Sequence, residues 1–260
     1  MTADSETSYG RWFYEYIDSS SKNAADAVVP AVLHITGARS VVDVGCGTGG
    51  WLKSFSDHGA TDILGMDASR VPLDLLKIGR DQFLEVDLIT PPPAPRAFDL
   101  AVSLEVAEHL PESAAEGFID YLCALAPVVM FSAAIPGQGG EDHLNEQWPS
   151  YWADHFSRRG FECIDALRAM FWNDDRVDWF YKQNMLLFVK SAAEVQLDLS
   201  NVHLLPPRPL SLVHPEVYSF AQSRLHRAMT TPLSLSALLR QSPRAARSAV
   251  KRRIDRLRSR

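Results

Sequence analysis

The stretch that decides the fold is Ser40-Val41-Val42-Asp43-Val44-Gly45-Cys46-Gly47-Thr48-Gly49-Gly50. A short apolar run followed by alternating glycines and then Trp51-Leu52 predicts a buried strand, a tight turn and a helix. Glycines at such a turn let the backbone approach a ligand closely and leave N–H groups free to bind it. The pattern Gly45-x-Gly47-x-x-Gly50 also fits dinucleotide sites, so the turn alone does not identify the ligand.

Outward from this turn, short apolar runs alternate with helical patterns. This alternation predicts a parallel sheet covered by helices, because parallel strands need helical crossovers. The predicted strands are 40–44, 63–66, 83–86, 98–104, 128–133 and 185–189, and the predicted helices are 9–33, with a break near 19–21, 50–58, 72–77, 112–125 and 149–159.

Acidic residues close the first three predicted strands. Asp43 ends the first strand, Asp67 the second and Asp87 the third. A carboxylate about twenty residues after a glycine turn suits two ribose hydroxyls. Asp43 would repel a pyrophosphate but suits an ammonium group, which favours S-adenosylmethionine (SAM) over NAD. We expect Asp87 to lie near the adenine amine.

The segments 41–49, 65–67, 86–88 and 98–100 resemble, in order, the successive motifs of class I SAM-dependent methyltransferases. The resemblance covers about 36–190. It implies an α/β, Rossmann-like fold with a mostly parallel seven-stranded sheet, six parallel strands and an antiparallel seventh, flanked by helices. It also implies the cofactor-binding residues Asp43, Gly45, Cys46, Gly47, Gly49, Asp67, Ala68, Asp87, Leu88 and Leu104.

Candidate catalytic residues follow the fourth strand, where open α/β sheets bind ligands. Glu105, Glu108 and His109 have i, i+3 and i+4 spacing, which brings them together if they lie on one helix. His143 belongs to a second cluster after the fifth strand. The set is similar to metal-dependent O-methyltransferases and suits Mg²⁺ or Mn²⁺. The alternative is a metal-free site in which His109 contacts the cofactor and His143 is a general base.

The glycine-rich loop 137–148 resembles that of bacterial methyltransferases of saccharides and cell-surface glycans. We therefore expect a sugar hydroxyl as the acceptor, with a small aromatic or polyketide metabolite as the alternative. A SAM-binding module without turnover is the rival from another class, and the convergent acids and histidines argue against it. The candidate substrate residues are Gln138, Asn145, Gln147, Trp148 and Tyr151.

Composition predicts an enzyme of the cytoplasm. The 46% hydrophobic residues suffice for a large core, the three cysteines have no disulfide or zinc spacing, and neither a signal peptide nor a membrane span is visible. We expect an N-terminal helical lid (1–35), the SAM-binding domain (36–191) and a proline-containing linker with a basic tail (192–260).

The charge is distributed unevenly along the chain. Residues 223–260 hold 11 of the 26 basic residues and one of the 32 acidic residues, which leaves 15 bases against 31 acids in the remainder. So acidic a body disfavours nucleic acid as the substrate. The tail, including a basic helix expected over 245–257, is a candidate for peripheral contact with anionic membranes.

Overall fold

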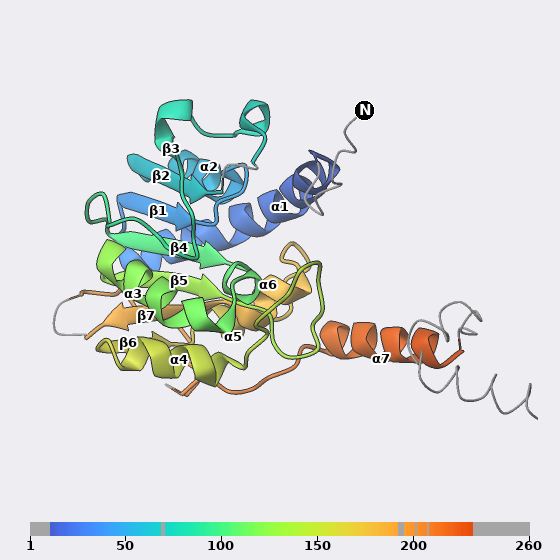
Figure 1. The fold of residues 1–260 in the computed structure, drawn as a ribbon. Coiled ribbons are helices and arrows are strands. Elements are labelled where there is room, and N and C mark those ends of the chain that lie inside the picture. The colour runs from blue at the N-terminus through green and yellow to red at the C-terminus, as the bar shows by residue number, and fades with distance from the viewer. Residues whose placement is uncertain (1–10, 69–70, 192–194, 201, 207, 231–260) are drawn as a thin grey trace, which may run out of the picture. The chain divides into compact units, whose positions relative to one another are not determined.

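The computed structural model describes residues 11–68, 71–191, 195–200, 202–206 and 208–230. Seven strands form one sheet in the order β3-β2-β1-β4-β5-β7-β6 (Figure 1). All neighbouring pairs are parallel except those made by β7, which runs antiparallel to both β5 and β6. This confirms the predicted fold. The strands are β1 (Ser40–Val44), β2 (Asp62–Asp67), β3 (Phe83–Glu85), β4 (Leu100–Leu104), β5 (Val128–Ser132), β6 (Phe161–Ile164) and β7 (Leu186–Lys190).

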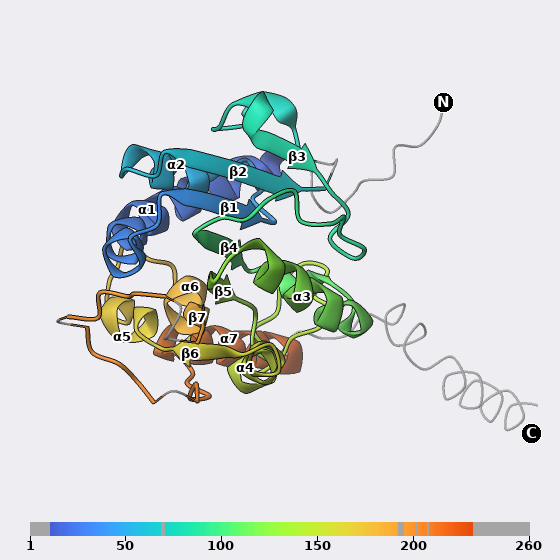
Figure 2. The same cartoon turned by 90° about the vertical axis from the view of Figure 1, so that its left-hand side faces the viewer.

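The central strands are mostly apolar because helices cover both faces of the sheet. Alternate residues of β1 show this: Val41 packs in one core cluster and Val42 in the other, and both are fully buried. Figure 2 shows α1 and α3 on opposite sides of the sheet. The first cluster contains residues of α1 (Arg11–Thr36), α2 (Gly50–Asp57), α5 (Leu167–Phe171) and α6 (Trp179–Asn184), and the second those of α3 (Ala115–Leu125) and α4 (Pro149–Ser157).

Some elements differ from the sequence prediction. Helix α1 continues without a break through Ser19–Ser21. The helix expected over 72–77 is wrong, because only Leu73–Leu75 form a 3-10 turn and the next residue is extended. Strand β6 and helices α5 and α6 are too short for their periodicity to be recognised.

Residues after β7 pack against the sheet domain. The amide of Asp198 donates to the carbonyl of Ile35 at 2.8 Å. The Arg168 guanidinium forms a fully buried ion pair with Asp165 and also donates to the carbonyl of Leu210 at 2.9 Å. The compact unit that contains the sheet accordingly runs to Val217.

A second unit begins at Tyr218. Helix α7 (Pro215–Thr230) begins in the first unit and ends in the second. The predicted basic helix 245–257 lies outside the described residues. Among the described helices, none combines the length and apolarity that crossing a membrane requires.

Candidate active site

The glycine turn after β1 has the conformation that glycine is needed for. Gly45, Gly47 and Gly49 have φ values of 86°, 54° and 84°. A Cβ atom on Gly45 would lie 2.3 Å from Cγ2 of Val106, so no side chain fits there. The amide of Gly45 donates to the carbonyl of Met66 at 2.7 Å and thereby ties the turn to β2. The turn is thus packed against Val106 at Gly45 and tied to β2, and its backbone is open at Gly47, where a Cβ atom would meet nothing within 4 Å.

Two carboxylates lie at this turn. The Asp67 carboxylate accepts hydrogen bonds from the amides of Gly47 and Ala68, at 2.7 and 2.6 Å. Asp43 is only 3% exposed. Burial, followed by the charge of Asp67, raises the pKa of Asp43 well above its usual range. The adjacent acids suit a ligand that carries positive charge and hydroxyl groups, and they disfavour a pyrophosphate.

Other predicted cofactor residues lie around the same edge. Cys46, Leu88 and Leu104 are buried, and Ala68 is half-buried. Asp87 lies two residues beyond the end of β3 and is exposed. Its carboxylate accepts hydrogen bonds from the amide of Ile89 and the hydroxyl of Thr90, which lowers its pKa. Asp87 therefore stabilises its own turn in this structure.

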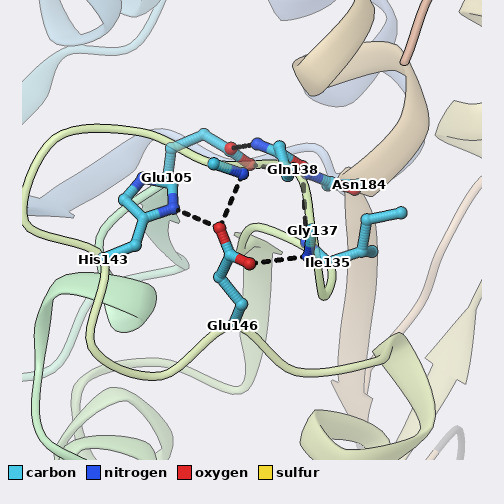
Figure 3. Close-up of polar contacts among 8 residues, drawn as sticks. Glu105, Ile135, Gly137, Gln138, His143, Glu146 and Asn184 are labelled. Carbon is cyan, nitrogen blue, oxygen red and sulfur yellow. Dashed lines mark hydrogen bonds and ion pairs between the residues drawn. The ribbon is translucent and has the colours of Figure 1, made fainter. Parts of the chain in front are cut away.

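Glu105 follows β4 and does not join a helix with Glu108 and His109, which corrects the predicted i, i+3, i+4 arrangement. Its φ of 55° breaks the helical path, and only Ala107–His109 form a 3-10 turn. The Glu105 carboxylate accepts hydrogen bonds from Nε2 of Gln138 at 2.8 Å and Nδ2 of Asn184 at 3.1 Å (Figure 3). Burial nevertheless raises the pKa of Glu105 above its usual range.

Glu108, His109 and His143 form a compact cluster. One ligand atom from each lies within 4.8 Å of the others, and the imidazole centroids of the two histidines are 4.8 Å apart. Glu108 is fully buried, and neither of its carboxylate oxygens has a hydrogen-bond partner among the described residues. Burial and the nearby Glu105 carboxylate raise the pKa of Glu108 well above its usual range. An unpartnered buried carboxyl beside two imidazoles fits a cation site.

Glu146 organises the loop that carries His143, and sequence analysis missed it. Its carboxylate accepts hydrogen bonds from the amides of Gly137 and Gly139, each at 2.7 Å, and lies 2.9 Å from Nδ1 of His143 (Figure 3). Burial tends to raise the pKa of Glu146, but the hydrogen bonds from His143, Gly137 and Gly139 outweigh it and leave the pKa below its usual range. The carboxylate is therefore ionised at neutral pH.

The predicted substrate residues divide by exposure. Gln138 and Asn145 are buried. The side-chain oxygen of Asn145 accepts a hydrogen bond from Nε2 of Gln147 at 2.9 Å, and the backbone N–H of Asn145 donates to the Glu108 carbonyl. Tyr151 is half-buried, and Trp148 is 36% exposed. Of these residues, Trp148 therefore offers the largest apolar surface to an incoming molecule.

Trp51 of α2 and Tyr181 of α6 form an aromatic pair that sequence analysis did not assign to the site. Trp51 and Tyr181 meet edge to face with centroids 5.2 Å apart, and the indole N–H lies 3.4 Å from the phenol oxygen. Burial raises the pKa of Tyr181, and the charges of Glu105 and Asp43 add to this effect. Tyr181 is thus close enough to Asp43 and Glu105 to feel the charges of both. No periodic pattern in the sequence indicates this contact.

Comparison with known proteins identifies the family. Residues 14–174 match the family described as Methyltransferase domain, which is more than half of the chain. The ribosomal RNA large subunit methyltransferase E of Caulobacter sp. (strain K31) is 32% identical over 85 residues, 32% of this chain and 36% of the relative. The chain thus spans about a third of the length of this curated relative.

Solved structures share the fold at low identity. The sugar N-methyltransferase KedS8 from Streptoalloteichus sp ATCC 53650 is 16% identical, with 73% of this chain and 98% of that chain covered and a TM-score of 0.53. A putative O-methyltransferase from Nostoc punctiforme PCC 73102 is 15% identical, with 68% and 59% covered and a TM-score of 0.51. The family match, the sheet order and the glycine turn with its two acids agree, and the chain belongs to the class I SAM-dependent methyltransferases, enzymes that transfer a methyl group from SAM.

Proposed function

We propose that this enzyme methylates a hydroxyl group and that Glu108, His109 and His143 hold a divalent cation next to the acceptor oxygen. The observation that supports this most directly is the Glu108 carboxyl, which is fully buried with both oxygens unpartnered among the described residues. Leaving such a group unsatisfied costs about 1–3 kcal/mol. A buried polar group without a partner is therefore expected at a functional site, where a ligand can satisfy it.

The donor set fits a divalent ion of the Mg²⁺ or Mn²⁺ type or one of the borderline metals. It combines one carboxylate with two imidazoles, and the three donor atoms lie within 4.8 Å of one another. Small side-chain movements suffice to bring such donors to one centre. When bound, the cation would act as a Lewis acid that lowers the pKa of the acceptor hydroxyl.

The chain's own residues would orient the methyl donor. We assign the ribose hydroxyls of SAM to Asp67 and its ammonium group to Asp43, directly or through water. The turn Gly45–Gly49, whose backbone is open at Gly47, would lie against the methionine part of the cofactor. β1 and β4 are adjacent and parallel, which supports a position of the sulfonium near the residues that follow β4. In-line transfer then requires only that the acceptor oxygen lie beside Glu108.

The acceptor we propose is a saccharide or a similar polyhydroxylated molecule. The loop after β5 carries two exposed apolar side chains, Leu144 at 66% and Trp148 at 36%, together with the half-buried amide side chain of Gln147 and the buried one of Asn145. Sugars present apolar C–H faces to aromatic rings and hydroxyl edges to amides. An aromatic or polyketide metabolite is the alternative, since it would use Trp148 without the amides.

RNA is a less suitable acceptor for this body, although the curated relative is named as an RNA methyltransferase. Outside residues 223–260 the chain has 15 basic and 31 acidic residues. Such a surface repels a polyanion, whose binding depends on neutralising phosphates.

The test combines metal, acceptor and variant. Chelator-treated protein is incubated with SAM and with pairs of acceptors in which one hydroxyl is replaced by an amine. Each reaction is run with and without Mn²⁺. S-adenosylhomocysteine and the methylated product are measured by mass spectrometry. We expect Mn²⁺-dependent methylation of the hydroxyl compounds and its loss in Glu108→Gln. Turnover without metal, retained in Glu108→Gln and abolished in His143→Asn, would refute the cation. It would support His143 as a general base instead. Methylation of only the amines would refute O-methylation.

A further inference from the structure

Glu146 contacts three residues of the loop after β5, and the proposed function gives it no role. Its two carboxylate oxygens receive the amide N–H groups of Gly137 and Gly139, and one of them also lies 2.9 Å from Nδ1 of His143. Figure 3 shows His143 and Gly137 on different sides of the Glu146 carboxylate, each joined to it by a dashed line. The side chain is 20% exposed and that of His143 is 12% exposed, so the interaction is shielded from water.

The direction of the His143 hydrogen bond follows from the other two. Backbone amides can only donate, so the carboxylate acts as an acceptor toward Gly137 and Gly139. An ionised carboxylate is an acceptor in all its hydrogen bonds, and Nδ1 of His143 must then carry the proton. In the neutral ring this leaves Nε2 unprotonated, with its lone pair available to a ligand.

Close packing holds the ring in this position. A Cβ atom on Gly140 would lie 2.1 Å from Nε2 of His143, so the ring edge lies directly against the glycine backbone. The His143 ring also meets the His109 ring edge to face, with centroids 4.8 Å apart. The backbone around the ring is fixed as well, because the amides of Leu144 and Asn145 donate to the carbonyl of Glu108 at 2.8 and 2.9 Å. The ring therefore has little freedom to reorient if its tautomer changes.

We propose that Glu146 is a positioning residue that holds His143 as the Nδ1–H tautomer, so that the Nε2 lone pair serves the Glu108–His109–His143 cluster. The claim that Nε2 binds a cation rests on the proposed function. The claim that Glu146 sets the tautomer of His143 is independent of it. A carboxylate behind a ligating histidine fixes the ring and increases its basicity, and its loss typically lowers metal affinity 10–100-fold.

The discriminating variant is Glu146→Gln. Its amide oxygen can still accept from one glycine amide, but its NH₂ group can donate to Nδ1 of His143 and thereby favour the Nε2–H tautomer. Glu162→Gln makes the same chemical change at an exposed position on the edge strand β6 and is the matched control. Glu146→Ala, which offers no hydrogen-bonding group to His143, is a second variant in case Glu146→Gln does not fold.

The tautomer is measured in chelator-treated, ¹⁵N-histidine-labelled protein by two-bond ¹H–¹⁵N correlation, with His143→Asn used to assign the His143 signals. Mn²⁺ affinity is measured in parallel by calorimetry. We expect an Nδ1–H ring in the wild type and in Glu162→Gln, a shift toward Nε2–H in Glu146→Gln, and Mn²⁺ affinity reduced about 10–100-fold in Glu146→Gln alone.

Two outcomes would overturn the proposal: an Nε2–H ring in the wild type, or an unchanged tautomer in both Glu146 variants, even with a lower melting temperature. The second would mean that Glu146 only stabilises the loop. An Nδ1–H ring that changes in Glu146→Gln, in a protein that binds no Mn²⁺, would support the positioning role and refute the cation of the proposed function.

Discussion

Replacing Glu108 with methionine should stabilise the metal-free protein and abolish its activity. The substitution keeps the approximate size of the side chain and removes two buried oxygens that have no hydrogen-bond partner among the described residues. An unsatisfied buried polar group costs about 1–3 kcal/mol, so the free energy of unfolding should rise by about that amount. For a domain of this size the melting temperature should rise by roughly 2–12 °C.

The gain should depend on pH in a direction set by the raised pKa of Glu108. The native state keeps this proton to a higher pH than the unfolded state, in which a glutamate titrates near about 4.3. Between those two pKa values the unfolded state binds fewer protons, and wild-type stability falls as pH rises. The difference between Glu108→Met and the wild type should therefore be smallest near pH 4 to 5 and grow toward pH 8.

The assay is thermal and urea unfolding of chelator-treated protein across this pH range, repeated with Mn²⁺. We expect Mn²⁺ to raise the melting temperature of the wild type and to leave Glu108→Met unchanged, because only a ligand that binds the native state stabilises it. A Glu108→Met protein that is less stable than the wild type at pH 8 without metal would refute the reasoning. It would show that the carboxylate has a favourable partner in the folded protein.

Four further predictions concern the cofactor turn, helix α3 and the core. Gly45→Ala should destabilise the protein by about 1–3 kcal/mol and abolish calorimetric binding of S-adenosylhomocysteine, because φ is 86° and the new Cβ would overlap Val106. Gly117→Ala in α3, where a Cβ meets nothing within 4 Å, should instead stabilise it by about 0.5–1 kcal/mol. Asp67→Asn should weaken S-adenosylhomocysteine binding at least tenfold in the same assay with little change in melting temperature, and unchanged affinity would exclude Asp67 from the ribose site. Arg168→Met should lower the unfolding free energy measured in urea by about 3–5 kcal/mol, because it leaves Asp165 buried without its fully buried partner, and a loss below 1 kcal/mol would contradict this.

The predictable parts of this protein are those whose residue type follows from a local backbone requirement. Positive φ at the cofactor turn demands glycine, and the buried parallel strands demand continuous apolar runs, so the turn 45–49 and most strands could be located from sequence. The cluster of Glu108, His109 and His143 could be predicted as residue types at strand ends, although the helix assumed to join Glu105 to it was wrong.

The remaining features depend on irregular backbone or on contacts distant in sequence. The φ of 55° at Glu105 directs its carboxylate toward Asn184, 79 residues away, and no periodicity encodes that turn. Glu146 lies in a loop without regular structure, where a glutamate three residues after a histidine has no special meaning until the backbone folds it onto Gly137. The packing of residues 195–217 against the domain is equally invisible, because prolines and polar residues there read as a linker.

Glu146 and Glu108 should have opposite effects on stability and the same effect on metal binding. Both carboxylate oxygens of Glu146 have hydrogen-bond partners in the protein, so this side chain should stabilise the fold. Glu146→Gln should therefore lower the unfolding free energy by about 1–3 kcal/mol. The Glu108 carboxylate has no hydrogen-bond partner among the described residues, so its replacement should raise that free energy. Both substitutions should nevertheless weaken Mn²⁺ binding. Opposite effects on stability with the same effect on metal affinity are what a ligand and its positioning residue predict, whereas two purely structural carboxylates would both destabilise the protein when removed.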